Sequence, residues 1–302
     1  MSIVEKAVEK LKALPVEPTA SPQVEAVPPH TAPTVERLQE RTRVVDQPME
    51  AAALYHLDRA ALRRRGLLLA DKEADRKLAD ELRRIKRPLL NNAMGKGAET
   101  FARGNRILVT SAEPGEGKTF AAVNLALSLA READFEVLLV DGDIPKSDIT
   151  HAFGLEGKLG LMDVVANEQL APTEAIIRTD VSNLLVVPAG KRHSLAAELF
   201  RSRRMEYVMD EFGGRNRRRL LVFDSAPLLV TTESHVLASH MGQVVVMVAA
   251  GRTRRQAVNS AVQSLNDLQY VGLVLNMSRL PASEDYFSRH YGQHFKALKG
   301  EV

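Results

Sequence analysis

Short runs of apolar residues recur along the chain from residue 107 onward and predict the strands of a buried sheet. The runs are continuous rather than alternating, which is typical of parallel strands that are covered on both faces. The predicted strands are Ile107–Ser111, Val137–Val140, Leu184–Val187, Leu220–Phe223, Val244–Val248 and Val271–Leu275. Helical periodicity lies between several of them, at Thr119–Ala130, Leu195–Glu211 and Arg254–Leu268. This alternation predicts an α/β fold with a doubly wound, mostly parallel sheet.

The N-terminal region has a different pattern, which predicts a helix and a linker ahead of this domain. Apolar residues recur at helical spacing over Ser2–Leu14, so we expect an amphipathic helix, which either frays or docks on a partner. Residues 15–50 are rich in proline and predict a flexible linker. One domain is expected over residues 51–280, followed by a mobile tail at 281–302. Within that domain, Asp71–Arg87 predicts a charged helix that ends at Pro88.

Composition excludes several classes of site and of protein. The chain has 302 residues, no cysteine and no tryptophan, so thiol catalysis, cysteine metal sites and disulfides are excluded. A net charge of +3 and 5% aromatic residues argue against a nucleic-acid surface. No apolar run approaches the ~20 residues of a membrane helix, and charged residues interrupt any signal peptide. The absence of cysteine fits a cytoplasmic protein, and if this protein works at a membrane, something else must hold it there.

A glycine-rich segment lies between the first predicted strand and the helix that follows it. It reads SAEPGEGKT from Ser111 to Thr119 and matches the phosphate-loop pattern GxxxxGK[ST], with Ala112 in place of the first glycine. Gly115 and Gly117 allow backbone amides to turn toward phosphate oxygens without a Cβ clash. The helix that starts there directs its positive dipole end at the anion. The strand before and the helix after this segment make a chance glycine-rich turn a poor explanation, so nucleotide binding is expected.

Aspartates follow two of the predicted strands. Asp141 and Asp143 come after the second strand, and Asp224 comes after the fourth. A single aspartate in this position is ordinarily a turn or helix-cap residue. Three of them at strand ends downstream of one phosphate loop favour a metal-binding and catalytic role.

Together these motifs resemble the bacterial tyrosine kinase family. The family's phosphate loop, its D-x-D strand end and its D-x-x-P strand end stand here in order, at Pro114–Thr119, Asp141/Asp143 and Asp224/Pro227. The N-terminal stretch from Ser2 is similar to that of exopolysaccharide-locus autokinases associated with exosortase (PEP-CTERM) systems. Such kinases transfer the ATP γ-phosphate to C-terminal tyrosines of neighbouring subunits and regulate exopolysaccharide biosynthesis and export.

The resemblance implies roles for individual residues. Lys118 and the loop amides would hold the triphosphate, Thr119, Asp143 and Asp224 would hold Mg²⁺, and Asp141 would orient or deprotonate the acceptor hydroxyl. Asn276 matches a position that contacts adenine, although a strand-end turn residue explains it equally well. The nucleotide-binding residues implied are Pro114, Gly115, Glu116, Gly117, Lys118, Thr119, Phe120 and Asn276.

The resemblance also implies an assembly. Glu81, Arg84 and Arg87 match the family's E-x-x-R-x-x-R oligomerisation motif, whereas on charge alone they would be a solvated helix face. We expect a homo-oligomeric ring, activated by a separate membrane polysaccharide co-polymerase, and no nucleic-acid partner.

The phosphate acceptors implied are Tyr286 and Tyr291, which are two of five tyrosines in the chain. Tyr207 and Tyr270 are expected in the core. Family tails are richer in tyrosine, and this departure leaves open a second hypothesis, an ATP-binding scaffold of the export machinery that transfers nothing.

A third hypothesis is a positioning ATPase of the ParA/MinD type, which shares the sheet and the D-x-D strand. Those proteins have an extra lysine early in the phosphate loop, where this chain has Glu113, and a carboxylate there would repel phosphate.

Overall fold

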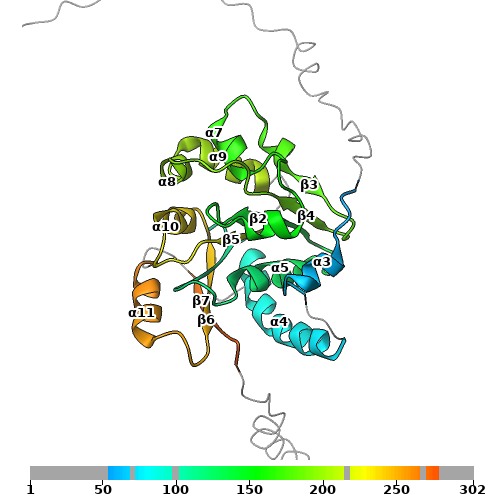
Figure 1. Ribbon diagram of the computed structural model, residues 1–302, viewed down its shortest axis with the longest axis vertical. Coiled ribbons are helices and arrows are strands. Elements are labelled where there is room, and N and C mark those ends of the chain that lie inside the picture. The colour runs from blue at the N-terminus through cyan, green and yellow to red at the C-terminus, as the bar shows by residue number, and fades with distance from the viewer. Residues whose placement is uncertain (1–53, 69–71, 97–101, 214–217, 266–269, 279–302) are drawn as a thin grey trace, which may run out of the picture. The chain divides into compact units, whose positions relative to one another are not determined.

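The computed structural model describes residues 54–68, 72–96, 102–213, 218–265 and 270–278 (Figure 1). The predicted helix Ser2–Leu14, the linker, and the tail with Tyr286 and Tyr291 lie outside the described residues. Within the described ranges, none of the helices combines the length and the apolar character that crossing a membrane requires.

The described chain forms a seven-stranded sheet in the order β3-β4-β2-β5-β1-β6-β7. The strands are β1 Arg106–Ser111, β2 Glu136–Gly142, β3 Ile177–Arg178, β4 Leu184–Val187, β5 Arg219–Ser225, β6 Gln243–Ala249 and β7 Val271–Asn276. All six predicted strands are confirmed, and their pairings are parallel. The two-residue strand β3 was not predicted and pairs antiparallel with β4 at the edge. The expected doubly wound, mostly parallel sheet is therefore confirmed.

Helices cover both faces of the sheet (Figure 1). They are α3 Arg59–Arg64, α4 Lys72–Ala93, α5 Lys118–Leu129, α6 Asp148–Ala152, α7 Leu161–Ala166, α8 Ala196–Phe200, α9 Arg203–Gly213, α10 Thr232–Ser239 and α11 Arg255–Gln263, with a 3-10 turn at Pro172–Ala175. Buried side chains of α3 to α6 form one core and those of α7 to α11 form the other.

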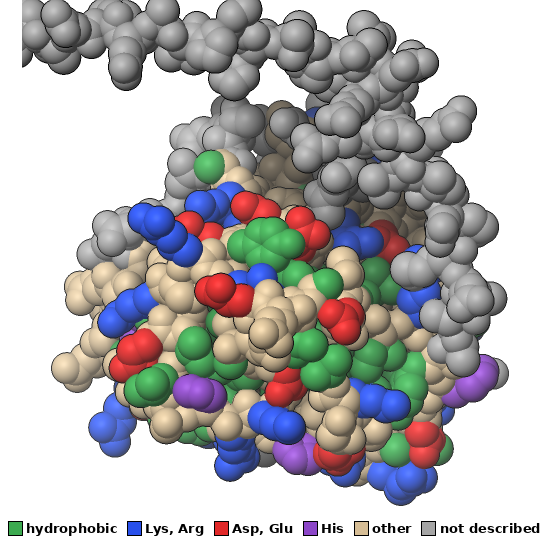
Figure 2. Space-filling view, turned by 90° about the horizontal axis from the view of Figure 1, so that it is seen from above, with side chains coloured by type: hydrophobic (Ala, Val, Ile, Leu, Met, Phe, Trp, Pro, Cys, Tyr) green, Lys and Arg blue, Asp and Glu red, His purple; other side chains and the backbone are tan. Residues whose placement is uncertain are grey.

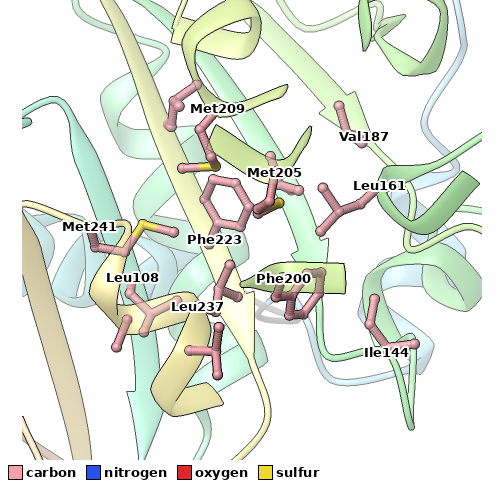
Figure 3. Close-up of a cluster of buried hydrophobic side chains, with 14 of the residues drawn as sticks. Leu108, Ile144, Leu161, Val187, Phe200, Met205, Met209, Phe223, Leu237 and Met241 are labelled. Atoms are coloured by element: carbon pink, nitrogen blue, oxygen red, sulfur yellow. The ribbon is translucent and has the colours of Figure 1, made fainter. Parts of the chain in front are cut away.

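Successive residues of β5 show how the sheet divides the two cores. Leu221 and Phe223 point into the core under α7 to α11, where Phe223 lies near Phe200 and Met205 (Figure 3). Leu220 and Val222 point into the opposite core. This alternation is the period-2 geometry of a strand, and it explains why central strands read as unbroken apolar runs.

Helix α4 continues to Ala93, six residues beyond Arg87, where the sequence predicted its end. Pro88 lies inside the helix, so the prediction that it stops the helix was wrong. Proline costs an intrahelical hydrogen bond, but contacts beyond it stabilise the continuation. Leu89 is buried, Asn92 Nδ2 donates to Gln243 Oε1 at 2.8 Å, and Gln243 Nε2 donates to the Leu89 carbonyl at 3.0 Å.

The single predicted helix Leu195–Glu211 is two helices, α8 and α9. Ser202 lies at the break, where its hydroxyl donates to the Leu199 carbonyl at 2.6 Å and accepts from the Met205 amide at 3.2 Å. A serine that accepts an amide of the following turn is a helix N-cap, and it starts a new helix here.

The expectation that Tyr207 and Tyr270 belong to the core holds only in part. Tyr207 on α9 is 48% exposed, and the Arg204 guanidinium lies 5.0 Å from its ring centroid. Tyr270 is half-buried against the core under α4 and α5. The helical position of Tyr207 was predicted correctly, but the polar face of α9 presents the ring to solvent.

One face of the described molecule mixes charges of both signs (Figure 2). The face in Figure 2 carries basic and acidic side chains side by side, with apolar side chains between them. Such a surface differs from the single-sign field that steers a highly charged partner over a long range.

Candidate functional site

The predicted phosphate loop connects β1 to α5 at the carboxyl edge of the sheet. Gly115 and Gly117 have φ angles of 77° and 86°, in the left-handed region that favours glycine. A Cβ built on Gly117 would lie 2.2 Å from Asn276 Nδ2, so a larger residue would require the Asn276 amide to move. Pro114 and Gly115 at the top of the loop are exposed, whereas Lys118 and Thr119 at its base are buried.

Lys118 joins the loop to the acidic strand ends. Its Nζ donates to Asp143 Oδ2 at 2.6 Å and lies 4.0 Å from Asp224 Oδ1. Burial alone would lower the pKa of Lys118, but the negative charges of Asp224 and Asp143 outweigh it and raise that pKa above its ordinary value. The lysine is therefore a buried cation that is already held among carboxylates.

Asp224 faces this cation with unused hydrogen-bonding capacity. Among the described residues, neither of its carboxylate oxygens has a hydrogen-bond partner. Burial raises the pKa of Asp224 to about 7, although the Lys118 charge and the Thr119 hydroxyl oppose the shift. A buried carboxylate with two free oxygens beside a threonine hydroxyl matches the all-oxygen ligand set that Mg²⁺ prefers. Thr119, Asp143 and Asp224 thus fit a magnesium ion.

Asp141 lies directly across from Asp224, because the two are register partners on β2 and β5. Its Oδ2 accepts from the Thr150 amide at 2.8 Å and from the Thr150 hydroxyl at 2.7 Å. Burial raises the pKa of Asp141 to about 6, against the effect of these hydrogen bonds. The Thr150 hydroxyl also accepts from the Ala189 amide at 2.8 Å, so α6 and the end of β4 orient this carboxylate.

Next to Thr150 a cleft of about 340 Å³ opens to the surface. Three basic side chains line it, Lys158, Lys191 and Arg192, and the Arg192 guanidinium also donates to the Pro145 carbonyl. Two acidic side chains, Glu156 and Asp163, line it too, and the Asp163 carboxylate accepts from the Gly160 amide at 2.9 Å. The cleft therefore offers basic groups close to Asp141.

Not all predicted residues lie in this cluster. Asn276 Nδ2 donates to the Glu116 carbonyl at 2.9 Å, so its amide contacts the phosphate loop itself. Phe120 is half-buried on α5. Glu81, Arg84 and Arg87 are exposed together on α4, outside the cluster.

Sequence reasoning missed Thr150 and Thr253. Thr253 donates from its hydroxyl to Glu116 Oε1, and Thr150 holds Asp141. Neither belongs to a motif, and the order of residues offers no signal for a contact that spans 137 positions along the chain.

Comparison with known proteins agrees with this geometry. A family model described as "AAA domain" matches residues 104–271. The tyrosine-protein kinase YwqD of Bacillus subtilis (strain 168) is 28% identical over 182 residues, which cover 60% of this chain and 75% of that protein. The tyrosine-protein kinase CpsD of Streptococcus agalactiae is 29% identical over 190 residues, covering 61% and 81%. The putative tyrosine-protein kinase EpsB of Ralstonia nicotianae is 29% identical, but only 23% of its length is covered.

Solved structures show the same relationship. The chimerical protein CapA2B2 is 25% identical with a TM-score of 0.55, covering 62% of this chain and 81% of that one. The BceF tyrosine kinase domain is 25% identical with a TM-score of 0.53, covering 65% and 76%. With a phosphate loop, two acidic strand ends and these relatives, the chain belongs to the AAA-domain family, within the group of bacterial tyrosine-protein kinases.

Proposed function

We propose that this protein is an ATP- and Mg²⁺-dependent tyrosine autokinase that regulates exopolysaccharide biosynthesis and export. It transfers the γ-phosphate to Tyr286 and Tyr291 of neighbouring subunits. The observation that carries the proposal is the cluster of Lys118 with Asp143 and Asp224 at the base of the phosphate loop, in a chain whose relatives are named tyrosine-protein kinases.

The loop and Lys118 bind the triphosphate. The Lys118 ammonium exchanges its ion pair with Asp143 for the phosphate oxygens, which carry more negative charge. Thr119, Asp143 and Asp224 would hold Mg²⁺, which would supply charge neutralisation at the phosphate oxygens. Released from Lys118, Asp143 is free to act as a ligand. Because Lys118 and Asp143 form an ion pair before nucleotide binds, nucleotide binding to Lys118 and release of Asp143 as a metal ligand are coupled.

Asp141 receives the acceptor proton. The phenol oxygen forms a bond to the γ-phosphorus as the bond from that phosphorus to the β,γ-bridging oxygen breaks, and the phenolic proton passes to Asp141. A pKa of about 6 leaves this carboxylate mostly ionised at neutral pH and more basic than an ordinary aspartate. Asp141 is fully buried, so the acceptor reaches it only when the residues that cover it move.

The basic cleft beside Thr150 supports an acidic acceptor segment. Glu284 and Asp285 directly precede Tyr286 in the sequence. Lys191 and Arg192 are exposed at the cleft and carry the opposite charge. Docking of these acids would bring the tyrosine toward the strand end that carries Asp141.

The assembly is part of the same proposal. Glu81, Arg84 and Arg87 on the exposed face of α4 contact neighbouring subunits in a ring, and a membrane polysaccharide co-polymerase activates the kinase. Through this partner the protein works in the cytoplasm at the inner membrane. The similarity to exosortase-locus kinases makes the polymer system of such loci the first to test.

Transfer of radiolabelled γ-phosphate tests the proposal. Label is expected on wild-type protein and is expected to disappear both in Lys118→Ala and in the double variant Tyr286→Phe/Tyr291→Phe. Tyr207→Phe is the matched control, because Tyr207 is the exposed tyrosine on α9 and its loss should leave labelling unchanged.

The scaffold hypothesis predicts a different result. It is favoured by the low number of tyrosines in the tail, where only Tyr286 and Tyr291 follow the last strand. A scaffold would bind ATP without labelling, even with the membrane partner present. Polymer output would then depend on Lys118 but not on either tyrosine.

A further inference from the structure

The top of the phosphate loop is held from outside by neighbouring elements. The Arg252 guanidinium, in the turn between β6 and α11, donates to the Gly115 carbonyl. Asn276, the last residue of β7, donates to the Glu116 carbonyl at 2.9 Å. Both contacts are made to backbone carbonyls, so they leave the backbone amides of Gly115 and Glu116 available as hydrogen-bond donors to phosphate.

Glu116 is the unusual member of this arrangement. Its side chain is 1% exposed, although it is a carboxylate inside a loop that is expected to receive a polyanion. Its Oε2 accepts from the Glu113 amide at 2.8 Å, and its Oε1 accepts from the Thr253 hydroxyl. The charge is thus bonded on both oxygens, which a buried carboxylate requires.

The residues outside the loop that contact Glu116 are connected to one pair of neighbouring residues in the sheet, Ala249 on β6 and Asn276 on β7. The Thr253 hydroxyl accepts from the Ala249 amide at 3.0 Å, and Ala249 is the register partner of Asn276. The Ala250 amide donates to the Asn276 carbonyl at 2.8 Å. Thr253 and Asn276, which contact Glu116 from outside the loop, are therefore both connected to the paired ends of β6 and β7.

We propose that Glu116 and Thr253 are positioning residues, which together with Asn276 hold the phosphate loop in this conformation before nucleotide binds. This inference rests on the proposed function, because it takes the loop to be the phosphate site. It assigns Asn276 a role in bracing the loop, where the sequence suggested an adenine contact or a turn.

The physical reason is the cost of ordering. The loop contains two glycines with left-handed φ angles, and an unbraced glycine-rich loop samples many other conformations. The loss of conformational entropy on ordering the loop then weakens nucleotide binding, whereas a loop that is ordered in advance binds more tightly. Removing the Thr253 hydroxyl leaves a buried carboxylate oxygen without its donor, and loop conformations that expose Glu116 to water become favourable.

Two measurements on the full-length protein test this inference. Calorimetric titration with Mg·ADP and with inorganic tripolyphosphate measures affinity, and hydrogen exchange of nucleotide-free protein measures protection of loop amides 115–118. Thr253→Val is expected to weaken both ligands about tenfold and to increase loop exchange. Thr253→Ser keeps the hydroxyl and should restore both properties. Thr173→Val, at an exposed threonine on the 3-10 turn, is the control.

A second variant distinguishes loss of the hydrogen bond between Thr253 and Glu116 from a general loss of packing. Glu116→Met should weaken Mg·ADP at least as much, and adding Thr253→Val to it should weaken binding little further, because the hydrogen bond between these two side chains is already absent in Glu116→Met. Wild-type affinity or unchanged loop exchange in Thr253→Val would overturn the inference. Failure of wild-type protein to bind Mg·ADP would instead overturn the proposed function, while the exchange comparison still decides whether the brace exists.

Discussion

Asp224 occupies an environment that a carboxylate ordinarily avoids. It is fully buried, its oxygens have no hydrogen-bond partner among the described residues, and its pKa is raised to about 7 by burial. Buried polar groups without partners cost stability unless a ligand satisfies them. In this account the ligand is magnesium with its nucleotide, so the cost belongs to the unliganded state and decreases on binding.

Replacement of this carboxylate should therefore increase the stability of the nucleotide-free protein while it removes activity. Asp224→Asn is expected to abolish phosphoryl transfer and to stabilise the nucleotide-free protein by about 1 to 3 kcal/mol at pH 8, since Lys118 keeps Asp143 as its partner. Because the folded-state pKa is raised, wild-type protein gains stability as pH falls toward 6 and Asp224 is protonated. Urea unfolding at both pH values should show a smaller difference at pH 6. A destabilised variant at pH 8 would contradict this account.

The basic charge of the cleft is expected to affect phosphoryl transfer to the acceptor tail and to leave the affinity for the nucleotide unchanged. The double variant Lys191→Glu/Arg192→Glu should reduce transfer to the tail of a second copy about tenfold, because the acidic residues before Tyr286 would be repelled. The assay mixes this kinase, lacking its own tail tyrosines, with a Lys118→Ala acceptor. Its affinity for Mg·ATP should stay at the wild-type value.

The control is Arg178→Glu, which reverses an exposed charge on β3 outside the cleft. Equal loss of transfer in this control would show that net charge, and not the cleft, sets the rate.

At the scale of elements, Pro88 costs stability within α4. The residue is exposed inside a 22-residue helix and cannot donate to the carbonyl one turn earlier. Pro88→Ala is expected to stabilise the protein by about 1 to 3 kcal/mol in urea unfolding, with phosphoryl transfer unchanged. Pro172→Ala is the matched control: Pro172 starts the 3-10 turn, where proline is favourable, so no gain is expected. A loss of stability in Pro88→Ala would mean that a kink there is required.

The elements also show which features a sequence can predict. In buried parallel strands nearly every residue is apolar, so the six predicted strands could be recognised and all were found. Strand β3 was missed because it has only two residues, which are too few to show an apolar pattern. The meeting of Asp141, Asp143 and Asp224 followed from topology, since parallel strands end at one edge. The course of α4 past Pro88 depends on Asn92 and Gln243, which lie 151 residues apart in sequence. Contacts of this kind, like that between Thr253 and Glu116, arise only when loops and helices pack.

At the scale of the whole molecule, the exposed face of α4 is expected to set the assembly. Glu81, Arg84 and Arg87 recur every three residues and are all exposed. Arg84→Glu with Arg87→Glu should convert the ring to monomers in light scattering after gel filtration, because like charges would then meet Glu81 across the interface. Arg83→Glu reverses a neighbouring exposed charge that pairs with Asp80 within the helix, and it should leave the mass unchanged. Wild-type mass in the double variant would exclude this face from the interface.

The most direct test of the central claim is a crystal structure with magnesium and a non-hydrolysable ATP analogue. We expect a magnesium ion about 2.1 Å from Thr119 Oγ1, with Asp143 and Asp224 as direct or water-bridged ligands. We also expect Lys118 Nζ to move from Asp143 to the phosphates. A nucleotide bound away from the loop, or a Lys118–Asp143 pair that stays closed with the aspartates turned from the metal, would contradict the central claim.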